Sequence, residues 1–168
     1  MRTHRIVFGA GACLAAAAAA GALSVGALGA GQTTPRCRAS DLAGAIIDRQ
    51  GAAGSRFARL VLVNTSSRTC HTRGFIRARL IGIDDRPLTT HVVRTHSTPV
   101  RTVIVKPGAA AALSIRWSVI PSGGGPCRLA RWITVTPPGA SSTVRVYFRD
   151  TACRGELDLG PLTDPATV

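Results

Sequence analysis

Four cysteines placed around two turn signals constrain most strongly what this chain can fold into. They are Cys37, Cys70, Cys127 and Cys153. In an exported chain an even number of cysteines indicates disulfides, and four cysteines allow three pairings. The first two lie at similar distances on either side of the glycine-rich turn at residues 51–55, and the last two flank a proline–glycine turn at residues 137–140. A hairpin at each turn brings its two cysteines together. The sequence therefore predicts the bonds Cys37–Cys70 and Cys127–Cys153, each contributing about 3 kcal/mol.

The N-terminus has the pattern of a targeting segment. Arg2 and Arg5 are followed by residues 6–31, which carry no charge and are rich in alanine and glycine. A basic region followed by an apolar run predicts a signal peptide at residues 1–30, with cleavage between Ala27 and Ala30. The alternative is an uncleaved anchor, since about 20 apolar residues span a bilayer. Lipidation of Cys13 is disfavoured because the usual upstream leucine is missing. We expect one secreted or envelope-associated domain at residues 31–168, with no membrane span after cleavage.

Short β-rich runs separated by turn signals fill the rest of the chain. They occupy residues 43–47, 57–63, 75–83, 102–105, 111–119, 132–136 and 144–148. The uninterrupted apolar run at residues 60–63 is typical of a strand buried on both faces. Helical periodicity is missing, and the tail at residues 163–168 is expected to fray. This spacing predicts an all-β fold, an immunoglobulin-like antiparallel β-sandwich with two disulfides.

The charge is strongly positive, with 21 basic and 8 acidic residues among 168 and a net charge of +13. Alternation along the predicted strands places five arginines on solvent-facing sides. These candidates for anion binding are Arg77, Arg79, Arg116, Arg145 and Arg149. The competing interpretation is compositional, because the chain has a single lysine against twenty arginines, as a GC-rich coding sequence produces. Net charge speaks to association and not to fold.

Catalytic and metal-binding patterns are weak. No carboxylate pair, nucleophile motif or phosphate-binding loop stands out, so we expect no enzyme, no catalytic residue and no cofactor. The histidines outside the N-terminal segment are His71, His91 and His96, and a metal site would need a loop to gather them. Trp117 is predicted to lie in the core, whereas Trp132 shares its strand face with threonines and is a candidate exposed aromatic. Nucleic acid is not expected as a partner, since aromatics are few and no recognition motif occurs.

The ordered set of landmarks resembles a family, the secreted actinobacterial domain of unknown function numbered 4232. The landmarks are Cys37 with Asp41-Leu42, the turn at residues 51–56, the run at residues 60–64 leading to Cys70, Gly74-Phe75, the segment at residues 107–109, Trp117, Cys127, the segment at residues 135–139, and Cys153 with Gly155 and Leu157. One departure is Ile76, where the family often has Gly-Tyr-Pro. The resemblance implies an exported or envelope-attached β-sandwich from a high-GC Gram-positive bacterium, and it transfers no catalytic residues.

Three functional hypotheses follow. The first is a non-enzymatic module that binds an anionic cell-wall polymer or another anionic envelope component through the arginine face. The second is a module that recognises an envelope protein through loops or a free sheet edge. The third is a secreted metal-binding protein or enzyme that uses the histidines. The sequence does not indicate an oligomeric state.

Overall fold

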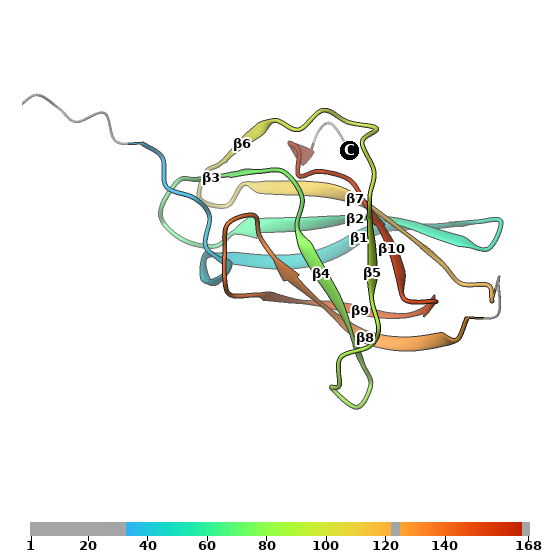
Figure 1. The fold of residues 1–168 in the computed structure, drawn as a ribbon. Helices are drawn as coiled ribbons and strands as arrows, with labels where there is room; N and C mark the ends of the chain where they lie inside the picture. Colours follow the sequence, from blue (N-terminus) through green and yellow to red (C-terminus); the bar gives the residue numbers. More distant parts are fainter. Residues whose placement is uncertain (1–32, 122–124, 166–168) are drawn as a thin grey trace, which may run out of the picture. The chain divides into compact units, whose positions relative to one another are not determined.

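Strands form where apolar and polar side chains alternate. In β7 (Ala110–Ser118) the side chains of Leu113, Ile115 and Trp117 are buried, whereas Ser114 and Arg116 between them are exposed. Period-2 alternation of this kind gives a strand one apolar face, which has to be covered by another layer. The computed structural model describes residues 33–121 and 125–165, and Figure 1 shows strands throughout that part of the chain.

The described elements are one short helix and ten strands. They are the 3₁₀ helix η1 (Ala39–Asp41), β1 (Leu42–Ala52), β2 (Ser55–Asn64), β3 (Cys70–Arg73), β4 (Arg77–Gly82), β5 (His91–Arg94), β6 (Thr102–Val105), β7, β8 (Cys127–Thr136), β9 (Val144–Cys153) and β10 (Glu156–Leu159). One sheet has the order β1-β2-β7-β10-β5, a second has the order β4-β8-β9, and β3 pairs with β6. All pairs are antiparallel except β5 with β10. The all-β class and the sandwich architecture are confirmed, with this one parallel pair as the departure.

The core lies between the inner faces of the two larger sheets. Five large side chains of this core are at most 1 % exposed. The five-stranded sheet contributes Leu60, Trp117 and Leu157, and the three-stranded sheet contributes Ile133 and Phe148. The rings of Trp117 and Phe148 pack edge to face, 4.9 Å between centroids. Such pairs add about 1 kcal/mol beyond the burial of their area. The prediction that Trp117 lies in the core is confirmed.

Strand β2 is central in its sheet, between β1 and β7. Leu60 and Leu62 face the core, and Val61 on the other face is only 9 % exposed, while Val63 is half-buried. The apolar run at residues 60–63 is therefore covered on both faces for most of its length, as predicted. A two-residue turn at Ala53 and Gly54, both with positive φ, closes the hairpin with β1.

Both predicted disulfides are present. Cys37 is bonded to Cys70 and Cys127 to Cys153. The second bond joins directly opposed residues of β8 and β9, as the hairpin argument requires. The first ties the segment before η1 to β3, where Arg36 also forms a bridge to His71.

The C-terminal segment corrects one expectation. Residues from 163 onward were expected to fray, but Thr163 is buried and exchanges two backbone hydrogen bonds with Ala112 of β7. Leu162 just before it is fully buried, so the apolar side chain holds the backbone in place. The proposed signal peptide at residues 1–30 lies outside the described residues. Among residues 33–121 and 125–165, no helix has the length and hydropathy to cross a membrane.

Strand β1 approaches β9 so closely that one position requires glycine. A Cβ atom at Gly44 would lie 2.4 Å from the Cγ2 of Val146, a core side chain of β9. The neighbouring Ala45 is exposed on the other face of β1. We predict that Gly44→Val lowers the free energy of unfolding by about 1–3 kcal/mol, because overpacking forces strands apart.

Urea unfolding followed by tryptophan fluorescence measures this change. Ala45→Val is the matched control, since it adds bulk one residue away on the exposed face, and it should stay within about 0.5 kcal/mol of the parent. Equal effects at both positions would contradict the close approach of β1 to β9.

Candidate functional site

A β-bulge in each of two neighbouring strands shapes an open groove on the described surface. In β1 the pairing with β2 shifts between Ile47 and Gln50, and Asp48 within the bulge has φ of 54°. In β9 the pairing with β8 shifts near Arg149, which has φ of 38°. Bulges re-aim side chains and are frequent beside binding sites. A positive φ at arginine is unusual and indicates a position held by its surroundings.

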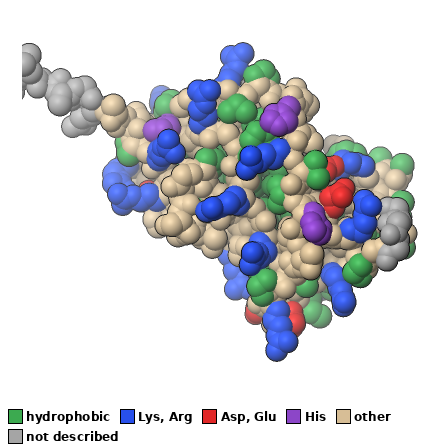
Figure 2. Space-filling view, in the orientation of Figure 1, with side chains coloured by type: hydrophobic (Ala, Val, Ile, Leu, Met, Phe, Trp, Pro, Cys, Tyr) green, Lys and Arg blue, Asp and Glu red, His purple; other side chains and the backbone are tan. Residues whose placement is uncertain are grey.

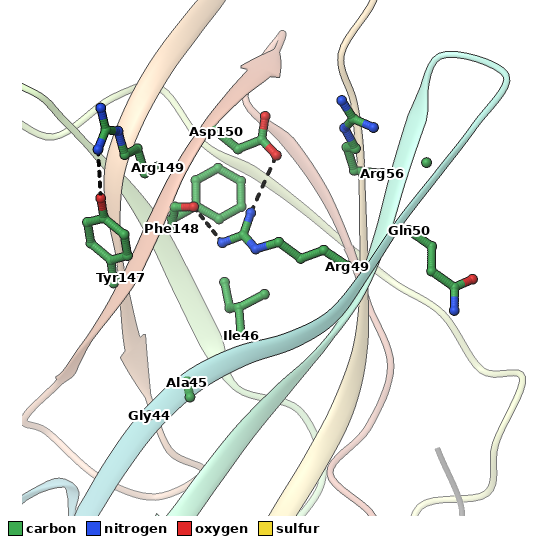
Figure 3. Close-up of a pocket in the computed structure, with 11 residues that line it drawn as sticks. Gly44, Ala45, Ile46, Arg49, Gln50, Arg56, Tyr147, Phe148, Arg149 and Asp150 are labelled. Carbon is green, nitrogen blue, oxygen red and sulfur yellow. Dashed lines mark hydrogen bonds and ion pairs between the residues drawn. The ribbon is translucent and has the colours of Figure 1, made fainter.

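Arg49 links the two bulges. Its guanidinium donates hydrogen bonds to the backbone carbonyl of Phe148 and, at 3.4 Å, to the carboxylate of Asp150. The same group lies 5.7 Å from the centroid of the Trp117 ring, where it covers that end of the core. Figure 3 shows the Arg49 side chain reaching from β1 across to β9. Arg49 therefore joins the two sheets, and its charge is committed to Asp150.

The groove between these strands, which we call the seam groove, has a volume of about 820 Å³. It is lined by Gly44, Ala45, Ile46, Arg49, Gln50, Gly51, Arg56, Tyr147, Phe148, Arg149 and Asp150. Arg56 and Arg149 are exposed and form no ion pair with another described residue. In Figure 3 they lie on opposite flanks of the groove, with Arg149 beside Tyr147. Because its one carboxylate is already engaged by Arg49, the groove presents mainly hydrogen-bond donors and positive charge.

Tyr147 connects the groove to the outer face of the three-stranded sheet. Its ring packs edge to face against Trp132 at 5.3 Å, and its hydroxyl accepts a hydrogen bond from Arg149 at 3.5 Å. Arg145 lies 4.6 Å and Arg131 5.5 Å from the centre of the Trp132 ring. Stacking on an aromatic ring limits the motion of a guanidinium while leaving its N–H groups available. We call Arg131, Trp132, Arg145, Tyr147 and Arg149 the arginine–aromatic cluster.

The five arginines predicted from alternation are all exposed, but they divide between the two sheets. Arg79 and Arg145 are both in register with Thr134 of β8, so they lie in one row across the outer face of the three-stranded sheet. Arg77 starts β4 and donates to the carbonyl of Ala140. Arg149 belongs to the same sheet through β9.

Arg116 is separate from this group. It lies on the outer face of the five-stranded sheet, where it pairs with Asp158 at 2.7 Å, donates to Ser55 and packs over Phe57. The structure therefore does not place Arg116 on the surface shared by the others, and its charge is balanced locally. Alternation identifies a solvent-facing side chain but not the sheet on which it lies.

The three histidines lie apart. His71 on β3 contacts the carbonyl of Thr34 through Nδ1, His91 begins β5, and His96 packs against Phe75 in the loop after β5. Among the described residues no group of three or more potential ligands could hold a metal ion. Trp132, a candidate exposed aromatic, is half-buried and flanked by guanidiniums.

Sequence reasoning missed Arg49, Arg56 and Arg131 as members of the site. Their placement depends on the two bulges, and a bulge breaks the alternation from which faces are read. The available signal was the polar run Asp48-Arg49-Gln50, which lies between the predicted strand at residues 43–47 and the turn at residues 51–55.

The fold and the groove define a disulfide-bonded β-sandwich domain with an arginine-lined surface. A family model described as "Domain of unknown function (DUF4232)" matches residues 37–163, and the chain belongs to this family. The side chain of Ile76 is buried, and it lies two residues after Gly74, which has φ of 101°. No curated protein and no solved structure matches the chain.

We predict that Arg49→Met destabilises the domain by about 1–3 kcal/mol. The substitution keeps the aliphatic length over Trp117 but leaves the Phe148 carbonyl without its donor, and an unsatisfied polar group of this kind carries such a cost. Urea unfolding measures the loss. Arg56→Met is the control, because Arg56 has no ion pair with a described residue to lose. Its unfolding curve should match that of the parent. If Arg49→Met unfolds at the same urea concentration as the parent, the link between the two sheets is dispensable.

Proposed function

We propose that this protein is an exported, non-enzymatic binding module that holds an anionic polymer of the cell envelope. The binding surface is the seam groove together with the arginine–aromatic cluster and Arg79. The observation that carries the proposal is the gathering of three guanidiniums around Trp132 and Tyr147. Arg145 pairs with Asp85, whereas Arg131 and Arg149 form no ion pair with a described residue.

The charge balance supports this surface. Six acidic side chains are already paired with an arginine, namely Asp41, Asp84, Asp85, Asp150, Asp158 and Glu156. Arg59 pairs with Asp48, and most of the other described arginines form no ion pair. Figure 2 shows basic side chains spread over the viewed face with few acidic ones between them. A surface of one sign attracts polyanions and speeds their association.

The shape of the site favours an elongated ligand. Arg56 lies on one flank of the groove and Arg149 on the other, and the cluster continues past Tyr147 to Arg145. A single small anion contacts only one or two of these groups, whereas a chain with repeated negative charges contacts several in succession. Arginine suits this role because its planar fork binds carboxylate or phosphate through two N–H groups.

Export is part of the proposal and rests on two features. The N-terminal sequence has a signal-peptide pattern, and two disulfides are typical of proteins that fold in an oxidising compartment. The twenty arginines and one lysine suit a high-GC genome, in keeping with an actinobacterial envelope.

The test is retention of the purified protein on isolated cell wall at low and at high salt. We expect retention at low salt and its loss as salt rises, since exposed charges are screened. Replacing Arg56, Arg131 and Arg149 together by glutamine should weaken binding roughly tenfold, at about 0.5 kcal/mol for each exposed contact.

The control replaces Arg38, Arg101 and Lys106 by glutamine. These residues are exposed, make no ion pair with a described residue, lie outside the three-stranded sheet, and give the same change in net charge. Equal weakening by both triple variants would reduce the effect to net charge. Retention that survives high salt would instead favour recognition of an envelope protein.

A further inference from the structure

A second cavity, separate from the seam groove, lies where β4 and the following loop meet the ends of β8 and β9. Its volume is about 530 Å³, within the usual range for small-molecule sites. It is lined by Leu80, Pro87, Leu88, Thr89, His91, Gly125, Pro126, Arg128, Ala152, Arg154 and Gly155. It shares no residue with the seam groove.

The floor of this cavity is apolar and firmly built. Leu80 and Ala152 are each 1 % exposed, and Leu88 packs against the core beside them. The amide of Leu88 donates to the carbonyl of Leu80, and the hydroxyl of Thr90 accepts from the Leu80 amide and donates to the Leu88 carbonyl. The wall formed by residues 86–90 is therefore fixed by hydrogen bonds before any ligand binds, and a preformed site loses little conformational entropy on binding.

The opposite wall is held by a disulfide and a tight turn. Cys127–Cys153 joins the ends of β8 and β9, and a two-residue turn at Arg154 and Gly155 leads directly into β10. The Gly155 carbonyl accepts from the His91 amide, and a Cβ on residue 155 would lie 2.0 Å from the carbonyl oxygen of Thr89. Glycine is thus required here, and the turn is pinned against the start of β5.

The rim is basic. Arg128 forms no ion pair with another described residue, and Arg154 pairs only with Glu156, at 3.6 Å. His91 stands opposite Glu156 in the parallel ladder. None of the lining residues is acidic. An apolar floor beneath two guanidiniums complements a molecule that has an apolar body and one anionic end.

Arg154 is the strongest indication that this rim is functional. Its φ is 59°, a conformation that asparagine or glycine adopts at lower cost in a tight turn such as this one between two sheets. A bulky residue kept in this conformation at the mouth of a cavity favours a role for its side chain.

We propose that this cavity binds a small amphipathic carboxylate, with the apolar part against Leu80, Leu88 and Ala152 and the carboxylate between Arg128 and Arg154. This site is independent of polymer binding at the seam groove. The carboxylate exchanges water for charge-assisted N–H bonds, and each buried methylene of the ligand adds affinity.

Titration calorimetry of the purified protein with hexanoate, octanoate and 1-octanol tests the proposal. We expect saturable binding of octanoate, at least tenfold weaker binding of 1-octanol, and a loss of about two- to fourfold for each methylene removed. Arg128→Gln should weaken octanoate about tenfold without changing 1-octanol, and Arg101→Gln, outside the cavity, should change neither.

Arg154→Asn separates binding from folding. Asparagine accepts the positive φ, so urea unfolding should show unchanged or higher stability while octanoate binds several-fold more weakly. The proposal is overturned if octanoate does not bind saturably, if 1-octanol binds as tightly, or if both arginine variants leave octanoate affinity unchanged. These outcomes leave retention on cell wall untouched, so failure of one proposal does not decide the other.

Discussion

The contact between Trp117 and Phe148 is the point on which the two sheets depend. It joins β7, the middle strand of the five-stranded sheet, to β9, an edge strand of the three-stranded sheet. The guanidinium of Arg49, from β1, lies over both rings. The guanidinium serves two purposes there, since it shields the rings and satisfies a carbonyl that the bulge in β9 removes from the ladder. The indole Nε1 of Trp117, by contrast, has no hydrogen-bond partner among the described residues, so this ring contributes through its packing and through its contact with the Arg49 guanidinium.

Much of the fold could be read from the sequence because local patterns determine it. Hairpin turns fixed the pairing of Cys37 with Cys70 and of Cys127 with Cys153, and alternation placed Trp117 in the core. The short strands β3, β5 and β10 were not foreseen. Four residues give periodicity little room to show, and β5 and β10 pair with each other although β6, β7, β8 and β9 lie between them in the sequence. Long-range pairing of this kind leaves no local signal.

The candidate site was predicted less well than the fold, for a related reason. Alternation correctly made Arg79, Arg145 and Arg149 solvent-facing, yet it grouped Arg116 with them because it carries no information on layers. The bulges at Asp48 and Arg149 change which face of the strand the following side chains occupy. The groove lies where the bulge of β1 and the bulge of β9 are opposite each other. Alternation assumes regular pairing, so it does not predict a site that is formed by two bulges.

The position of β10 has a consequence for how the core closes. This strand lies between β7 and β5, although it is the last of the described strands in the sequence, and it brings the fully buried Leu157 and Leu159 into the core. Until residues 156–159 are available, β7 and β5 each retain an open edge and the sandwich has a gap through its larger sheet. The core of the domain therefore cannot close until these four residues have taken their place between β7 and β5. Closure of the larger sheet thus depends on a strand that comes after all the other described strands in the sequence.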